Sequence, residues 1–252
     1  MSDVNEIVEL AENVKEFTVE NLETIKEKLQ SIVDNPTDLI RYATLAKPLK
    51  NFIKEKAPFL YPSWQFWDNV DKFFNSGILN DNDKKKLIDK LSSDKNKNKV
   101  GKKIIGIIEK VETDKKLVYI INATKSLVDD KIEFPIYFRI CHTISQTLEE
   151  DLQFLNNHID KKAISYSIEV NGLIASGLAY NRGIGENDAP SYAFNEFAKV
   201  VNEYALKGDG QKRIEEFNLN KPPQTTFLTT NDIANEEDVQ KMFEEIFSDN
   251  SK

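Results

Sequence analysis

The pattern of apolar and polar positions between residues 98 and 160 predicts three consecutive amphipathic helices, the last of them over 133–158. In each helix apolar side chains recur every three or four residues, which places them on one face. The three series are Ile104, Ile105, Ile108, Val111; then Leu117, Ile120, Ile121, Thr124, Leu127; then Phe134, Phe138, Cys141, Ile144, Leu148, Leu152, Leu155. Faces this apolar have to be buried against other helices. The pattern therefore predicts a helical core with little room for a cluster of catalytic side chains.

The chain before this core carries the same helical spacing. It predicts helices over residues 2–33, 37–57, 64–76 and 82–92, and then a lysine-rich loop at 94–99. Asn35-Pro36 ends the first helix, because the residue before a proline avoids helical backbone. Ser63 is a suitable N-cap for the helix at 64–76, and Gly77 is a suitable stop.

After residue 160 the pattern changes. A helix over 163–176 precedes two short strands, 177–183 and 191–194, which flank a polar loop, and a further helix covers 195–206. This order predicts a winged-helix-like module. Glycines, prolines and threonines make 207–230 a predicted linker, and 232–247 a last amphipathic helix. We therefore predict a mainly α protein with a helical bundle (1–160), a small winged-helix-like α+β module (161–206), and a linker with an acidic tail helix (207–252).

Composition narrows the class of protein. Nine glycines and eight prolines in 252 residues are few for an all-β fold. A single cysteine, together with the lack of a secretory segment, predicts a reducing cytoplasm. No apolar run approaches the roughly 20 residues that span a bilayer. The net charge of −8 disfavours binding to phosphate backbones by the molecule as a whole.

Chemistry-bearing residues are few. Cys141 and His142 are adjacent, so on a helix they point about 100° apart and do not form a nucleophile pair by themselves. Cys141 falls on the apolar face, which predicts a structural thiol. One cysteine and two histidines, the second being His158, fall short of a closed zinc site. Asp129, Asp130 and Asp151 offer the alternative of a metal-dependent enzyme, whereas helix capping and solvation explain the same acidic residues without a ligand. No cofactor is expected.

The stretch from Lys84 to Lys103 contains nine lysines and two aspartates, a local charge of +7. It offers the alternative of a nucleic-acid-associated protein, with Lys95, Lys97, Lys99, Lys102 and Lys103 as candidate contacts. Arginines that read bases and aromatic rings that stack on them are absent from this stretch, so a solvated loop is the competing interpretation.

Aromatic residues concentrate between Phe59 and Phe74. Core packing explains them, and so does a protein-docking surface. The tail from 231 to 252 has a net charge of −5 and apolar residues at helical spacing, as in a helix that binds in a groove. The candidate partner-binding residues are Trp64, Trp67, Phe74, Met242, Phe243 and Phe247.

The order of several segments resembles a group of helical bacterial and phage proteins that includes the abortive-infection alpha family. The resemblance covers residues 60–206. It rests on the proline-bracketed stretch Lys47-Pro48 to Pro62, Phe73-Phe74, Lys99-Val100-Gly101, Glu150-Asp151-Leu152-Gln153-Phe154-Leu155, a Gly-Leu strand, and Ser191-Tyr-Ala-Phe-Asn-Glu-Phe197. It brings no catalytic motif, and it implies a role in phage–host conflict.

Together these observations predict a non-enzymatic interaction or regulatory protein in phage defence or its evasion. Its expected partner is another protein, with nucleic acid disfavoured, and the chain could also form a homo-oligomer.

Overall fold

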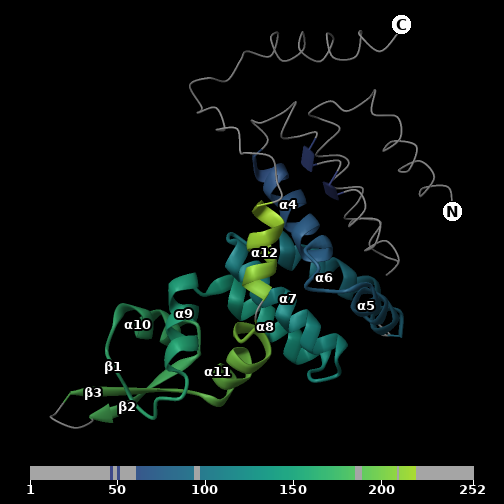
Figure 1. Ribbon diagram of the computed structural model, residues 1–252. Helices are drawn as coiled ribbons and strands as arrows, with labels where there is room; N and C mark the ends of the chain where they lie inside the picture. Colours follow the sequence, from purple (N-terminus) through teal and green to yellow (C-terminus); the bar gives the residue numbers. More distant parts are fainter. Residues whose placement is uncertain are drawn as a thin grey trace, which may run out of the picture.

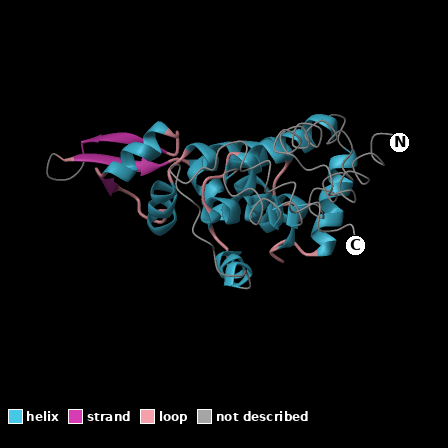
Figure 2. Ribbon diagram, turned by 90° about the horizontal axis from the view of Figure 1, so that it is seen from above, coloured by secondary structure: helices cyan, strands magenta, loops and turns pink. Residues whose placement is uncertain are grey.

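The computed structural model describes residues 46–47, 50–51, 61–93, 97–184, 189–208 and 210–219. The helices predicted at 2–33 and 232–247, and most of the one at 37–57, lie outside these residues. Figure 1 shows a helical body with a small sheet at one end, and in Figure 2 the strands lie together at that end while helices fill the rest. The described part is therefore mainly helical with a small α+β module towards the C-terminus, as the sequence predicted.

Three helices begin the described body: α4 (Tyr61–Asn75), α5 (Asp81–Ser93) and α6 (Lys97–Glu109). Helix α4 begins before Ser63, so the prediction of Ser63 as its N-cap is wrong; Gly77, with φ +80°, follows the end of the helix as expected. A reciprocal cap begins α5, since Asn80 and Asp83 each accept the other's backbone N–H. Helix α6 already includes 97–99, which the sequence assigned to a loop.

Helix α7 (Asp114–Val128) is the central helix. Thr113 caps it by accepting the N–H of Lys116, and eleven of its residues are buried on several faces. A helix that is apolar around most of its circumference belongs inside a bundle. Helices α4, α5, α8 and α12 all pack against it.

The helix predicted at 133–158 is in fact two helices, α8 (Phe134–Gln146) and α9 (Glu149–His158). Thr147 separates them. Its backbone is extended, and both its N–H and its hydroxyl bond back to the carbonyl of Thr143. Because side-chain bonds of this kind compete with helical ones, the chain turns here. Leu148, predicted on the buried face, is consequently 63% exposed.

The small module contains β1 (Ile164–Ser165), α10 (Ile168–Ala175), β2 (Ala179–Ile184) and β3 (Pro190–Phe194). The strands are antiparallel in the order β1-β3-β2. The two strands of the hairpin were predicted, but the helix expected at 163–176 is wrong in its first half, where β1 forms. Ser167 caps α10 by accepting the N–H of Val170, which fixes the start of the helix after the strand.

Helix α11 (Glu196–Val201) continues as a π-helical turn, η3 (Asn202–Leu206), which packs on α7. Side chains of α7 bond to the widened turn: Asn122 donates to the carbonyl of Ala205, and Ser126 donates to that of Tyr204. Helix α12 (Gly210–Leu219) follows, so the prediction of a linker is wrong for 210–219.

One apolar core connects body and module, because the buried residues from Ala46 to Leu206 form a single cluster. Strand residues such as Ile164 and Phe194 belong to this cluster together with Trp67 and Ile104. Among the helices that the structure describes, none combines the length and apolar character that a bilayer crossing requires.

Candidate functional site

The aromatic segment that was predicted as a docking surface belongs largely to the core. Trp67 and Phe74 are buried, and Trp64 is half-buried and packs against the core. Burial favours core packing, the other interpretation of this segment, for Trp67 and Phe74. Met242, Phe243 and Phe247 lie outside the described residues.

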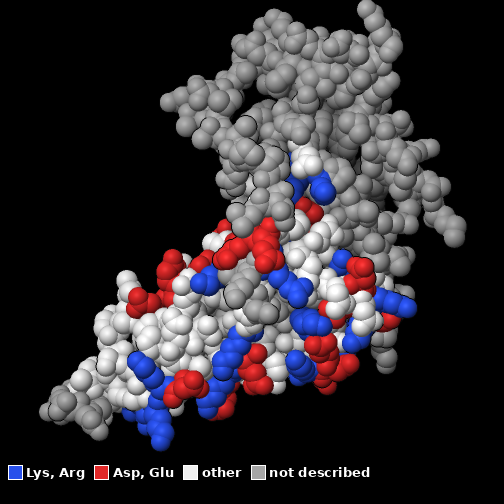
Figure 3. Space-filling model, viewed as in Figure 1, with Lys and Arg blue, Asp and Glu red and all other residues white. Residues whose placement is uncertain are grey.

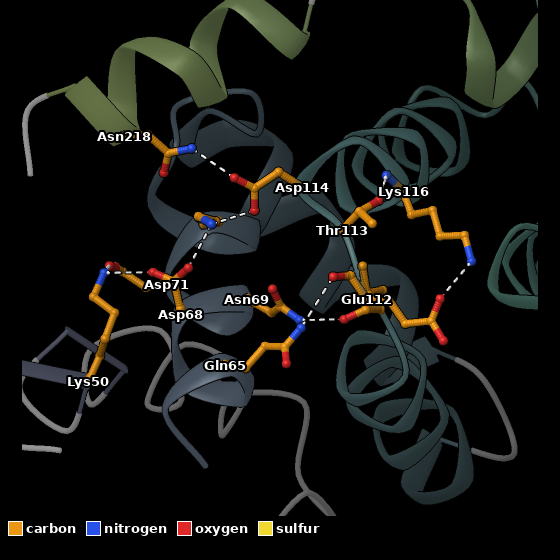
Figure 4. A network of polar contacts seen from close by, with 12 residues as sticks. Lys50, Gln65, Asp68, Asn69, Asp71, Glu112, Thr113, Asp114, Lys116 and Asn218 are labelled. Atoms are coloured by element: carbon orange, nitrogen blue, oxygen red, sulfur yellow. Dashed lines mark hydrogen bonds and ion pairs between the residues drawn. The ribbon is translucent and has the colours of Figure 1, made fainter. Parts of the chain in front are cut away.

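A network of buried charges lies beside these rings on the polar face of α4 (Figure 4). Lys50 pairs with Asp71 and, at 3.3 Å, with Asp68. Lys72 pairs with Asp68 at 2.6 Å and with Asp114 at the start of α7. Burial alone would lower the pKa of Lys72, but the charges of Asp68 and Asp114 and their hydrogen bonds more than offset this and raise it. The carboxylates are therefore held by cations of the same chain.

Amide side chains extend the network to neighbouring helices. Asn218 of α12 donates to Asp114 at 2.7 Å, and Asn69 donates to the carbonyls of Ile108 and Val111. These two carbonyls lie at the C-terminal end of α6, where backbone acceptors lack helical partners. The cluster thus connects α4, α6, α7 and α12, and its groups serve to fix helices against one another.

The aspartates of the metal-site alternative are not brought together. Asp129 lies near Lys125 and Lys131, at 3.4 Å and 3.9 Å, and Asp130 pairs with Lys90 at the turn after α7. Asp151 is buried between α9 and α10 instead. Within the described ranges, no three His, Cys, Asp or Glu residues converge in a way that could hold a metal ion.

Asp151 has the most unusual surroundings of the acidic residues. It is 5% exposed, and a Cβ added at Gly172 of α10 would lie 2.0 Å from its Oδ2. Burial raises the pKa of Asp151, and repulsion from Glu169 and Glu150 adds to this. The carboxylate therefore occupies the space in which any residue other than glycine would place its Cβ. It lies at the contact between α9 and α10.

Cys141 and the two histidines do not form a site. Cys141 is fully buried and burial raises the pKa of its thiol to about 12, which keeps the thiol protonated. His142 is exposed, whereas Cys141 is buried. His158 stacks on Phe154 with ring centroids 4.1 Å apart, and its Nδ1 is 2.9 Å from the carbonyl of Phe154. The prediction of a structural thiol is confirmed.

The lysine-rich stretch is divided between α5 and α6. Lys84 pairs with Asp81 at 3.0 Å, Lys90 pairs with Asp130, and the Lys103 Nζ lies 5.0 Å from the ring centroid of Phe138. Lys95 and the side chains of Lys97, Lys99 and Lys102 lie outside the described residues. Lys84, Lys90 and Lys103 thus contact groups of their own chain, which adds no support for nucleic-acid binding.

Large apolar side chains on the surface gather in one part of the chain. Among the described residues, those that are most exposed fall between positions 148 and 184: Leu148, Tyr166, Ile168, Tyr180 and Ile184. Ile168 and Ile184 are 79% and 78% exposed. None of them was predicted as a site residue. The alternation Ile164-Ser-Tyr-Ser-Ile168 was the available signal, since it has the period of a strand rather than a helix.

The strand register brings three of these residues to the same end of the sheet. Ser165 pairs with Ser191, so Tyr166 follows at the level of Pro190, and Ile184 pairs directly with Pro190. Alternation along the strands places Tyr166, Ile184 and Pro190 on the same sheet face as Ile164 and Tyr192. Ile168, the first residue of α10, lies at the same end. We call Tyr166, Ile168, Ile184 and Pro190 the hairpin-end patch.

The hairpin-end patch continues the core of the module. Ile164, Tyr192 and Phe194 lie on the same sheet face and are buried. Tyr166 touches this row, since its ring centroid is 6.2 Å from that of Tyr192. The inner part of this apolar sheet face is therefore buried, and its outer end is open to solvent.

Comparison of the chain with protein-family models, with curated proteins and with solved structures finds no match.

Proposed function

We propose that this chain is a non-enzymatic protein that binds another protein through the hairpin-end patch. The observation that carries the proposal is the exposure of Tyr166, Ile168 and Ile184 on an apolar face continuous with the core. Large apolar side chains in contiguous surface positions are typical of protein interaction sites. Aromatic and aliphatic anchors of this kind supply most of the binding energy at such sites.

The polar clusters support a non-enzymatic role. Asp68, Asp71 and Asp114 are bound by lysines of the same chain, and Cys141 is buried and protonated. An active site needs a nucleophile or base held within reach of a substrate in a concave site. The buried groups named here are instead committed to fixing helices.

Binding of a partner strand to the edge of the sheet is less suitable than binding through side chains of the hairpin-end patch. β2 is an edge strand, but its register shifts between Asn181 and Gly183, and the Gly183 N–H bonds to the Asn181 side chain at 2.6 Å. Bulges of this kind protect an edge against pairing with another chain. Side-chain contacts at the hairpin-end patch are therefore the proposed mode. The resemblance to the abortive-infection alpha family would place the interaction in phage–host conflict.

A quantitative pull-down from the native host tests the proposal. The bait is the full chain, and it is compared with Ile168→Ser/Ile184→Ser, with a matched control, Leu148→Ser, and with a chain ending at residue 230. The expected result is a partner that is retained by wild type and by Leu148→Ser and lost by the double variant. Retention of every bound protein by the double variant would refute the patch. Loss on truncation alone would assign binding to the tail helix instead.

A further inference from the structure

Asp151 is a carboxylate within an otherwise apolar contact between two helices. α9 and α10 pack against each other, and besides Asp151 they bury Leu152, Leu155, Val170 and Leu173. The carboxylate faces the backbone of α10, since a Cβ built on Gly172 would lie 2.0 Å from its Oδ2 and 3.1 Å from its Oδ1. Glycine at position 172 is therefore what allows the two helices to close around this side chain.

The charged groups near Asp151 do not compensate it. On α9 itself Glu149 and Glu150 directly precede it, and His158 lies at the other end of the helix. α10 contributes Glu169, and the charges of Glu169 and Glu150 both repel the ionised carboxylate. Among the described residues no hydrogen bond or ion pair reaches the Asp151 side chain. A buried carboxylate without donors or cations is costly when it is ionised and much less so when it is protonated.

The remaining element that packs on α9 brings no cation either. η3 carries Glu203, which is exposed, and Tyr204 as its ionisable residues. It is joined to α9 by a hydrogen bond between two neutral amides, those of Asn202 and Asn156. Figure 3 shows the surface over α10 as largely uncharged, with acidic side chains at its border. Protonation is thus the means by which this carboxyl becomes suited to its place.

We propose that the contact between Asp151 and Gly172 is a pH-sensitive switch, which holds α9 against α10 when the carboxyl is protonated and loosens when it ionises. Burial and the two neighbouring acids raise the pKa of Asp151 above its ordinary 3.8. The stability that the protonated form supplies is therefore present below that pH and is lost as pH rises through the raised value. Opening of a single helix contact requires less free energy than unfolding of the whole chain, so the loosening is local.

The switch acts on the helix that carries part of the hairpin-end patch. Ile168 begins α10, and Gly172 lies about one turn later on the same helix. Looser packing of α10 at higher pH is expected to weaken binding at the patch, and this consequence rests on the proposed function. The switch itself is independent of that function, because it can be measured without a partner.

Amide hydrogen exchange of the full chain, followed by NMR between about pH 4 and about pH 8, measures the opening of α10. Rates are divided by the intrinsic exchange rate at each pH, and the amides of α7 report unfolding of the whole chain. The amides of α10 are expected to exchange before those of α7. The carboxyl signal of Asp151 in ¹³C-labelled protein gives its pKa, and the fold-change in opening is expected to follow from that pKa and the ordinary one.

Asp151→Asn is the test variant, because it keeps the size of the side chain and removes its charge. Relative to this variant, α10 in wild type is expected to open more readily as pH rises. Glu169 titrates in the opposite sense, since a hydrogen bond with Ser167 lowers its pKa, but both chains contain it and the difference removes it. Asp160→Asn is the matched control, since Asp160 is an exposed acid directly after α9, and it is expected to leave the pH profile of wild type unchanged.

Three results would overturn the switch. The first is a parallel pH profile of α10 in wild type and Asp151→Asn. The second is exchange of the α10 amides no faster than those of α7, which would mean that the contact opens only with the whole fold. The third is titration of the Asp151 carboxyl at or below the ordinary value, a measurement on wild type that decides the matter even if the variant fails to fold.

Discussion

Replacement of Lys72 by methionine is expected to destabilise the fold strongly. The Lys72 side chain is 7% exposed and lies 2.6 Å from Asp68, which is 4% exposed. Methionine keeps the size of the side chain and removes the charge. Asp68 then keeps only Lys50 of these two cations, at 3.3 Å. Asp114 loses its pairing as well, but its side chain is 35% exposed, so water compensates part of that loss.

The expected loss in the free energy of unfolding depends on which charge remains buried without its partner. Removing one partner of a buried ion pair costs about 3–5 kcal/mol, because the other charge is left without compensation. The surviving contact between Asp68 and Lys50 places Lys72→Met at the lower end, about 3 kcal/mol. For a chain of this size that corresponds to a fall in Tm of about 6–12 °C.

Urea denaturation followed by far-ultraviolet circular dichroism measures the effect. Lys84→Met is the matched control, since Lys84 pairs at 3.0 Å with Asp81, whose side chain is fully exposed. Its expected cost is about 0–1 kcal/mol. If the free energy of unfolding fell equally in the two variants, the assignment of Lys72 as a buried structural charge would be refuted. Combining Lys72→Met with Asp68→Asn is expected to recover part of the loss.

Three further predictions concern α6, α9, α10 and the buried thiol. Burial and the neighbouring acids raise the pKa of Asp151 above its ordinary 3.8, so the stability that its protonated form supplies is present below that pH and is lost as pH rises through the raised value. Asp151→Asn is therefore expected to be more stable than wild type at pH 7 and equal to it near the ordinary pKa; a constant difference across pH in thermal unfolding would contradict this. Gly172→Ala places a Cβ 2.0 Å from Asp151 Oδ2 and is expected to cost about 1–3 kcal/mol, whereas Gly106→Ala, with nothing within 4 Å, is expected to stabilise by about 0.5–1 kcal/mol in the same urea assay. The thiol of Cys141 is expected to react with a maleimide only after unfolding, and rapid labelling of the native protein would disprove its burial.

The helical spacing of apolar residues was sufficient to predict most of the helices. Ile104, Ile108 and Leu117 occupy the core positions that their spacing required. The break at Thr147 could not be read from the spacing, because apolar residues continue in register across it. Only the hydrogen bonds from Thr147 to the Thr143 carbonyl show that the chain turns there.

Helix α12 was missed for a related reason. Among the α12 side chains that the structure describes, Ile214 is the buried apolar one, and a single residue forms no amphipathic series. Distant polar contacts hold it: Arg213 donates to the carbonyl of Gly77, and Asn218 donates to Asp114. Contacts between residues that are far apart in sequence leave no local pattern.

The candidate site shows the same limit. Trp67 and Ile184 are both large and apolar, and sequence gives no measure of which one is covered. In the folded chain Ile184 is 78% exposed, whereas Trp67 is enclosed in the helical core. Exposure here depends on contacts between elements that meet only in the folded molecule.

The π-helical turn at 202–206 determines how the sheet is attached to the helical bundle. Two of its carbonyls accept hydrogen bonds from Asn122 and Ser126 of the central helix. In addition, Asn202 donates to Asn156 of α9 at 2.8 Å. These three hydrogen bonds fix the segment that follows β3 to two helices of the bundle. The sheet is consequently connected to the central helix by a short segment, α11 and η3, that is hydrogen-bonded to that helix directly.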